Sequence, residues 1–130
     1  MTRQEINKRV NGVVAQTLGL DEDETITATS HLIKDLGAES IDFLDLTFRL
    51  EREFGIKIPR NELFPESVFR ESPEFIKNGK ITDEGVTKLK EALPYADAFE
   101  NVEIERTVDS VKELFTVGLI YNYIDWKLKL

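Results

Sequence analysis

The sequence predicts an all-α fold, because apolar residues recur at helical spacing in three separate segments. Residues 3–18 carry one apolar stripe, residues 40–54 show the same period, and a third apolar segment begins at Thr107. The 130 residues are 41% hydrophobic with only four prolines, which is enough for one compact domain with a core. The stripe of the first segment consists of Ile6, Val10, Val13, Val14 and Leu18.

Capping residues predict where these helices begin and end. Thr2 is suited to be an N-cap, with Glu5 placed to complete a capping box, and Gly19 predicts the end of the first helix. Thr82 predicts the start of a later helix, which Pro94 ends.

Three other segments are expected to lie outside helices. Residues 21–30 are rich in acids and threonine and predict a solvated loop. Residues 56–59 predict an extended connector, since a proline biases the residue before it away from helix. Residues 99–105 alternate between apolar and polar side chains, which predicts a short extended piece.

The composition excludes several classes of protein. There is no cysteine and His31 is the only histidine, so we expect no disulfide, no metal site and no Ser-His hydrolase. The net charge of −8 argues against nucleic-acid binding and favours basic protein partners. No signal peptide and no bilayer-spanning run is evident, so we expect a cytoplasmic protein without stable membrane insertion.

The segment 40–54 predicts a helix with two apolar rows on different faces. The first row is an ordinary core face, formed by Phe43, Leu46, Leu50 and Phe54. The second row consists of Ile41, Leu44 and Phe48, and the acids that flank it are Glu39, Asp42, Asp45 and Glu51. Because unpaired charge is costly to desolvate, we predict that this second row docks partners. The alternative is a helix that is buried on two sides.

Ser40 is the most informative residue of the chain. A glycine turn brings its hydroxyl to the start of the predicted helix, and no acid or base catalyst accompanies it in the sequence Asp35-Leu36-Gly37-Ala38-Glu39-Ser40-Ile41-Asp42. A serine nucleophile would need a partner base, and the Gly-x-Ser-x-Gly elbow is absent. The arrangement therefore favours a serine that is covalently modified over one that attacks a substrate.

The stretch from Ser30 to Pro59 resembles the acyl carrier proteins. It has the Leu36-Gly37 turn, a serine at position 40 where that family has its modified serine, the acidic helix and the run Phe54-Gly55-Ile56-Lys57-Ile58-Pro59. The usual triplet of that family is Asp-Ser-Leu, whereas this chain has Glu39-Ser40-Ile41. Residues 43–45 and 78–89 look more like specialised long carriers than like the short carriers of bulk fatty acid synthesis.

The resemblance implies a four-helix bundle of the acyl-carrier type, with an enlarged segment between the second and last helices. It implies one domain over residues 1–130, with a core of about 1–64 and 107–130 and an insertion of about 65–106. It also implies that a phosphopantetheinyl transferase attaches 4′-phosphopantetheine to Ser40, and that the arm holds acyl groups as thioesters. The protein would then be a carrier, not an enzyme, and we expect a monomer.

The same resemblance implies that the second helix presents its acids and apolar row to basic patches on synthases and acyltransferases of a specialised fatty acid or lipid pathway. Arg49 and Arg52 interrupt the acidic helix, and we predict that they help to select dedicated partners. The aromatic surplus of the middle and last segments could line a cavity for a long acyl chain, fill a small core of the insertion, or be buried in a dimer.

Two other functions remain open at this point. One is a carrier of polyketide or aminoacyl units, which differs only in its cargo. The other is a carrier-like interaction module that is never loaded, in which Ser40 would be kept as a helix cap.

Overall fold

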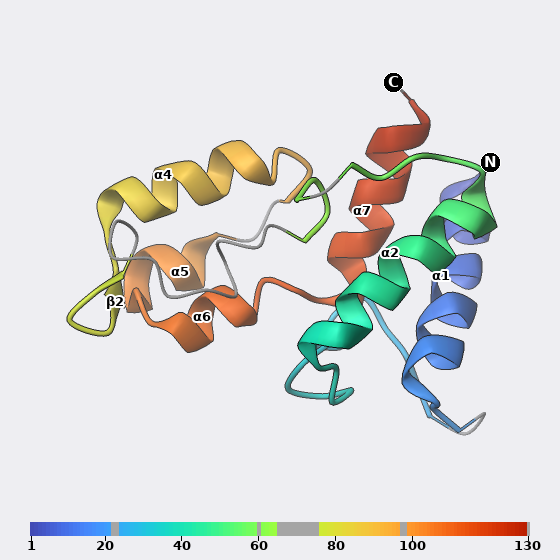
Figure 1. Cartoon of the computed structure of the whole chain (residues 1–130), viewed down its shortest axis with the longest axis horizontal. Helices are drawn as coiled ribbons and strands as arrows, with labels where there is room; N and C mark the ends of the chain where they lie inside the picture. The colour runs from blue at the N-terminus through green and yellow to red at the C-terminus, as the bar shows by residue number, and fades with distance from the viewer. Residues whose placement is uncertain (22–23, 60, 65–75, 97–98, 130) are drawn as a thin grey trace.

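The computed structural model describes residues 1–21, 24–59, 61–64, 76–96 and 99–129. The predicted border of the insertion near residue 65, and part of the acidic loop, lie outside the described residues. The chain is mainly helical, as predicted (Figure 1). In order, its elements are α1 (Arg3–Leu18), α2 (Ser40–Phe54), β1 (Ile76–Lys77), β2 (Lys80–Ile81), α4 (Asp83–Ala92), α5 (Glu100–Glu105), α6 (Val108–Lys112) and α7 (Val117–Leu128).

The predicted ends of the first two helices are confirmed. The Thr2 hydroxyl accepts a hydrogen bond from the Glu5 backbone N–H at 3.2 Å, and it thereby satisfies a donor that the helix itself cannot pair. Gly19 and Gly55 end α1 and α2 with φ of 64° and 63°, in the left-handed region that glycine adopts without strain.

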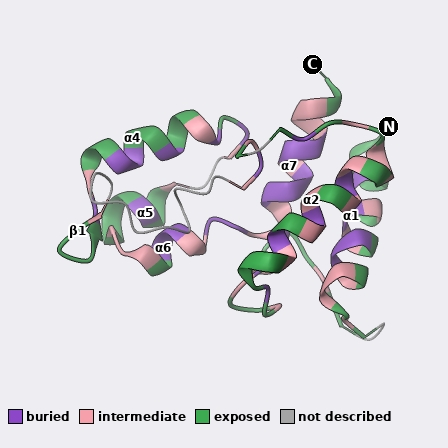
Figure 2. Ribbon diagram, viewed as in Figure 1, coloured by how far each residue is buried: buried purple, intermediate pink, exposed green. Residues whose placement is uncertain are grey.

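The helices form two groups that lie side by side (Figure 1). In one group α1 packs against both α2 and α7, and each of these helices carries both buried and exposed residues (Figure 2). The other group contains α4, α5, α6 and the β1–β2 hairpin. The expected acyl-carrier-type bundle with an enlarged segment between its second and last helices is confirmed, while the predicted domain borders stay a prediction.

The hairpin was not predicted. Ile76 pairs with Ile81 and Lys77 with Lys80, and the two strands are only two residues long each. Asn78 and Gly79 form the turn with φ of 56° and 76°, which is the pattern of a tight hairpin turn.

The prediction of an extended piece at residues 99–105 was wrong, because these residues form α5. In a strand Val102 and Ile104 would share a face, but in the helix they diverge: Val102 is fully buried and Ile104 is 80% exposed. Glu100 and Glu103 favour the helix because acids near its N-terminus oppose the positive end of the dipole.

The last helical segment also differs from the prediction of one helix that starts at Thr107. It is divided into α6 and α7, each with a threonine N-cap: Thr107 accepts from the Ser110 N–H at 3.1 Å, and Thr116 accepts from the Leu119 N–H at 3.2 Å. The chain between them runs extended past residues 28–32, where its backbone groups find partners outside any helix.

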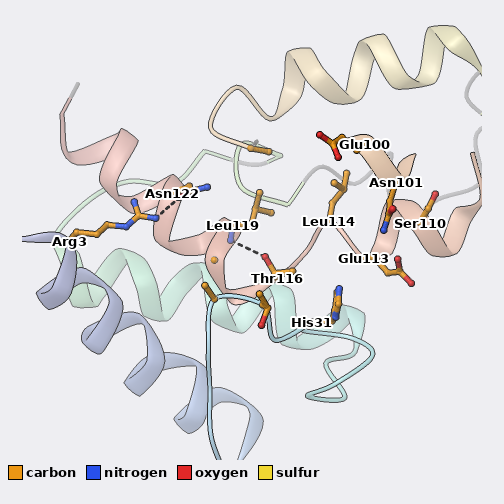
Figure 3. Close-up of a pocket in the computed structure, with 14 residues that line it drawn as sticks. Arg3, His31, Glu100, Asn101, Ser110, Glu113, Leu114, Thr116, Leu119 and Asn122 are labelled. Carbon is orange, nitrogen blue, oxygen red and sulfur yellow. Dashed lines mark hydrogen bonds between the residues drawn. The ribbon is translucent and has the colours of Figure 1, made fainter. Parts of the chain in front are cut away.

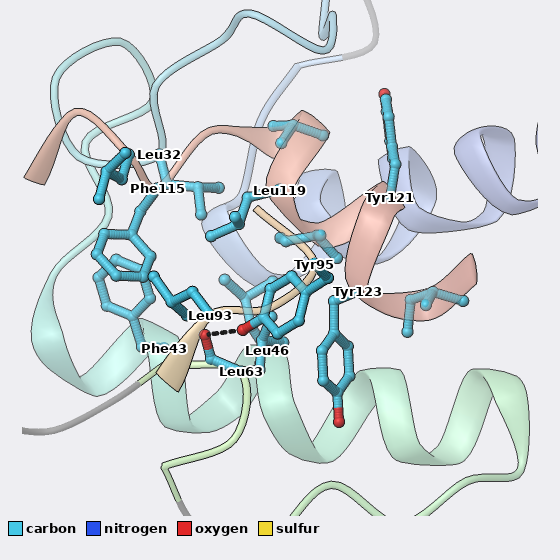
Figure 4. Packing of buried hydrophobic residues seen from close by; sticks show 14 of the residues in the cluster. Leu32, Phe43, Leu46, Leu63, Leu93, Tyr95, Phe115, Leu119, Tyr121 and Tyr123 are labelled. Atoms are coloured by element: carbon cyan, nitrogen blue, oxygen red, sulfur yellow. Dashed lines mark hydrogen bonds between the residues drawn. The ribbon is translucent and has the colours of Figure 1, made fainter. Parts of the chain in front are cut away.

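Aromatic side chains fill the core and account for much of the aromatic surplus (Figure 4). Phe43 meets Phe64 edge-on at a centroid distance of 4.7 Å, and Phe115 completes this cluster at 6.4 Å from Phe43. Tyr95 and Tyr123 pack at 5.0 Å, which joins the segment after α4 to α7. In the described residues these aromatic side chains therefore pack against one another, and the cavity for a long acyl chain stays a prediction.

Glu62 connects the chain after α2 to α7. Its carboxylate accepts hydrogen bonds from the Tyr123 hydroxyl and from Lys127 Nζ, both at 2.6 Å, and charge-assisted bonds of this kind are strong. The Tyr95 hydroxyl donates to the backbone carbonyls of Glu62 and Leu63. Burial raises the pKa of Tyr95 and of Tyr123, with Glu62 as a further cause, so both phenols stay protonated donors.

A close backbone approach at Gly118 gives the first prediction. A Cβ at this position would lie 2.7 Å from the carbonyl oxygen of Ala28, so Gly118→Ala must push the two segments apart. We expect a loss of about 1–3 kcal/mol in the free energy of unfolding, the range for overpacked sites.

Gly12→Ala is the matched control for this prediction. Gly12 lies inside α1 with no atom within 4 Å of an added Cβ, so the same change should stabilise the protein by about 0.5–1 kcal/mol. Urea unfolding measures both variants. A Gly118→Ala protein as stable as Gly12→Ala would show that the two segments are not held as close as described.

Candidate functional site

A short backbone ladder fixes the segment that leads to Ser40. The Leu32 N–H donates to the Phe115 carbonyl, the Val117 N–H to the Ser30 carbonyl, and the Gly118 N–H to the Ala28 carbonyl, each at 2.9 Å. Residues 28–32 are thus paired antiparallel with the chain between α6 and α7. The ladder ties the approach to Ser40 to the last part of the chain.

The turn that follows is held by backbone hydrogen bonds and by Asp35. The Asp35 carboxylate accepts from the His31 N–H at 2.8 Å and lies 3.0 Å from His31 Nδ1. The His31 backbone N–H is the main cause that lowers the pKa of Asp35, with the His31 ring as the second, so the carboxylate stays ionised at neutral pH. The predicted glycine turn is confirmed, since Gly37 has φ of 72°.

Ser40 is the first residue of α2 and is exposed to solvent. Its hydroxyl makes no hydrogen bond with any side chain that the structure describes. The imidazole of His31 faces Asp35 instead. The Ser40 hydroxyl is therefore accessible to an incoming enzyme but has no base to activate it as a nucleophile.

The start of α2 is suited to hold an anion on Ser40. The first N–H groups of a helix lack partners within it and form the positive end of its dipole, so a phosphate ester is favoured there. A capping box takes up two nearby donors, since the Asp42 carboxylate accepts from the Glu39 N–H at 2.8 Å and the Glu39 carboxylate accepts from the Asp42 N–H. The residues present thus fit a phosphodiester on Ser40.

The two apolar rows of α2 are separated as the sequence predicts. Phe43, Leu46 and Leu50 are buried against the bundle, whereas the second row of Ile41, Leu44 and Phe48 is 71%, 59% and 56% exposed. This helix is therefore not buried on two sides. The exposed row begins next to Ser40 and continues along the helix for two turns.

The charged residues around the exposed row differ in the bonds that they already make within the protein. Glu39 is exposed and its carboxylate accepts from the Asp42 N–H, while the Glu51 carboxylate accepts from the Ile58 backbone N–H at 2.9 Å. Asp45 forms an ion pair with Arg49 at 3.1 Å. Arg52 is exposed and has no ion pair within the described ranges.

The predicted turn and helix are confirmed, while Ser40 as the attachment residue stays a prediction. The structure places residues 41, 44 and 48 together on one exposed face next to Ser40. Sequence reasoning missed the ladder, because pairing between residues 28–32 and 115–118 depends on segments far apart in the chain. It also missed the bond of His31 to Asp35, for which the spacing of four residues in a turn was the available signal.

Comparison with known proteins places the chain in a family. The family model described as "Phosphopantetheine attachment site" matches residues 8–70, which include most of α1, the turn and all of α2. This match and the helical bundle define the class of carriers whose cofactor is 4′-phosphopantetheine, attached covalently to a serine.

Similar proteins show which kind of phosphopantetheine carrier the chain resembles. The acyl carrier protein AcpXL of Mesorhizobium japonicum is 51% identical over 90 residues, which cover 69% of this chain and 86% of the relative. AcpXL of Rhizobium meliloti is 39% identical over 82 residues, covering 63% and 76%. The acyl carrier protein of Thermotoga maritima is 40% identical over 62 residues, covering 48% and 75%. The chain therefore belongs to the acyl carrier protein family, and the similarity to AcpXL fits a specialised long form.

No solved structure matches the chain. Among the described residues, no helix is long and apolar enough to cross a bilayer, and no cluster of three or more His, Asp or Glu side chains could hold a metal ion.

Proposed function

We propose that Ser40 is the residue to which 4′-phosphopantetheine is attached in this acyl carrier protein. The observation that supports this most is the position of its exposed, unbonded hydroxyl at the first residue of α2, inside the matched attachment-site region. The helix N-terminus would stabilise the phosphodiester, and the arm supplies the thiol that holds acyl groups as thioesters.

The protein itself would position the arm and its cargo, and its partner enzymes would supply the catalysis. The isolated Ser40 hydroxyl has no general base, so loading needs a phosphopantetheinyl transferase that supplies one. The acyl-processing enzymes that follow would likewise bring the catalytic groups. We infer a cytoplasmic, monomeric carrier that serves synthases and acyltransferases of a specialised fatty acid or lipid pathway.

The docking surface of this carrier would be the exposed face of α2. Its apolar contacts would come from Ile41, Leu44 and Phe48, and its charge contacts from Glu39, Asp42, Asp45 and Glu51. Each of these carboxylates also accepts a bond within the protein: Glu39 and Asp42 in the capping box, Asp45 from Arg49, and Glu51 from the Ile58 N–H. Arg52 would give the far end of this face a positive charge that disfavours partners with uniformly basic patches, and Arg49 would add less because it is paired with Asp45.

Loading tests the attachment residue directly. Incubation with coenzyme A and a broad-specificity phosphopantetheinyl transferase should add one phosphopantetheine to the native chain, as measured by intact-protein mass. Ser40→Ala should gain nothing. Ser30→Ala is the matched control, since Ser30 lies in the same matched region but its hydroxyl accepts from the Thr27 N–H at 3.0 Å. A native chain that stays unmodified would favour the unloaded interaction module.

The docking face gives a separate prediction. Leu44→Gln removes an exposed apolar contact one helical turn from Ser40, and interface contacts of this kind contribute about 1–2 kcal/mol. We expect kcat/KM for loading by the transferase to fall about tenfold, with the thermal stability of the apo protein unchanged.

Ile104→Gln is the control for this measurement. Ile104 is an equally apolar and more exposed side chain, but it lies on α5, away from the proposed face. Its substitution should leave kcat/KM unchanged. If the two variants behaved alike, the exposed row of α2 would not be the surface that the transferase contacts.

A further inference from the structure

The sequence contains the dipeptide Asn-Gly twice, and the structure places the two copies in different surroundings. Asn78 and Gly79 form the exposed turn between β1 and β2, whereas Asn11 and Gly12 lie inside α1. An asparagine before glycine loses its side-chain ammonia readily, because glycine has no side chain that hinders the approach of its backbone nitrogen. The surroundings of each copy therefore decide whether this reaction occurs in the folded protein.

The side-chain amide of Asn78 is free to react. It makes no hydrogen bond with any residue that the structure describes, and both turn residues are exposed. The Gly79 N–H lies at the third position of a two-residue hairpin turn, where the hydrogen-bond ladder leaves it unpaired. No atom lies within 4 Å of the place that a Cβ would take at Gly79, so no neighbouring group shields the turn.

The hairpin holds this turn only weakly. Each strand has two residues, and a two-stranded ribbon of that length is marginal by itself. Lys77 and Lys80 lie directly opposite each other, and like charges in such a pair destabilise it. Local opening of a segment of this kind costs far less free energy than global unfolding, so Asn78 can reach the conformation that the reaction needs.

Asn11, in contrast, is held at both ends of its side-chain amide. Its Oδ1 accepts a hydrogen bond from the Tyr121 hydroxyl, and its Nδ2 donates to the Ile26 carbonyl at 3.5 Å. The Gly12 N–H lies inside a helix of 16 residues, where it donates to the carbonyl four residues earlier. The attacking nitrogen and the amide that it would attack are thus both engaged, and α1 would have to unfold locally before they could react.

Two further asparagines show that exposure alone is not sufficient. Asn101 and Asn122 line a groove between α7 and the α5–α6 segment (Figure 3). Asn101 is exposed as Asn78 is, but the branched side chain of Val102 hinders the next backbone nitrogen, and both residues lie in α5. Asn122 accepts a hydrogen bond from Arg3 and is followed by a tyrosine (Figure 3). Among the described asparagines, Asn78 alone combines an exposed, unbonded amide with a following glycine.

We propose that the fold selects Asn78 as a site of spontaneous deamidation while it protects Asn11. The Gly79 backbone nitrogen loses its proton to water or hydroxide and attacks Cγ of the Asn78 amide. The bond between Cγ and Nδ2 breaks, and ammonia leaves with a proton from the solvent, so that a succinimide ring remains. Water then adds to one of the two ring carbonyls and opens the ring, which gives aspartate or isoaspartate at position 78.

The two products differ in their effect on the hairpin. Aspartate adds a negative charge between Lys77 and Lys80 and leaves the backbone as it was. Isoaspartate also adds one carbon to the backbone, which disturbs the register of strands that are only two residues long. Beyond the turn, the Ile81 N–H donates to the Arg106 carbonyl at 2.7 Å and thereby ties β2 to the end of α5. We expect the isoaspartyl form to loosen this tie and the aspartyl form to keep it.

Peptide mapping of the aged native protein tests the site. The protein is incubated at mildly alkaline pH and digested with pepsin in acid, and mass spectrometry follows the gain of about 1 Da in the peptide that contains each asparagine. We expect Asn78 to react at least about tenfold faster than Asn11, which corresponds to about 1.4 kcal/mol in activation free energy. A protein isoaspartyl methyltransferase with a labelled methyl donor should label the aged native chain but not aged Asn78→Gln.

The same incubation in urea separates the effect of the fold from that of the sequence. Both Asn-Gly copies are free in the unfolded chain, so Asn11 and Asn78 should then react at similar rates. A native protein in which Asn78 reacts no faster than Asn11 would overturn the proposal, and so would a ratio of rates that urea leaves unchanged. Neither measurement involves phosphopantetheine, so the result is independent of the proposed function.

Hydrogen exchange of the Ile81 amide tests the structural consequence. The isoaspartyl form, separated from the aged protein by chromatography, should exchange this amide about tenfold faster than fresh protein does. Asn78→Asp is the matched control, since it has the new charge without the longer backbone, and it should exchange as fresh protein does. Equal exchange in all three samples would overturn the expected loosening of the hairpin.

Discussion

The backbone ladder between residues 28–32 and 115–118 is the constraint on which the site depends. It joins the approach to Ser40 to the chain between α6 and α7, with three N–H···O bonds of 2.9 Å. Without it, the turn at Gly37 would be anchored mainly by its own local bonds. Since Gly118 brings this ladder to the first turn of α7, one set of contacts positions the serine turn and the last helix together.

This arrangement divides the molecule into surfaces with different tasks. The buried face of α2 joins the bundle, and its other face exposes an apolar row beside Ser40 that we propose docks partners. The segment between α2 and α6 adds α4, α5 and a hairpin to this bundle.

Local chemistry explains which parts of the fold and of the site could be predicted from the sequence. The ends of α1 and α2 follow from Thr2, Gly19 and Gly55, because caps act within one turn. The turn before Ser40 could be predicted from Gly37. The separation of α2 into a buried and an exposed apolar face could be predicted from its two apolar rows. The break at Thr116 and the helix at residues 100–105 could not be predicted in the same way, since tertiary contacts decided between states of similar local propensity. The ladder depends on how two distant segments pack, which no local pattern specifies.

Hydrogen exchange of the apo protein tests most directly whether the ladder holds the serine turn. The amides of Leu32, Val117 and Gly118 donate its three bonds, and amides that open only with global unfolding exchange with the full free energy of unfolding. We expect these three to be protected as strongly as the amides of Val10 and Val14 in the core of α1. Exchange far faster than that of the α1 core would show that the ladder opens on its own, and the serine turn would then have to be positioned by something else.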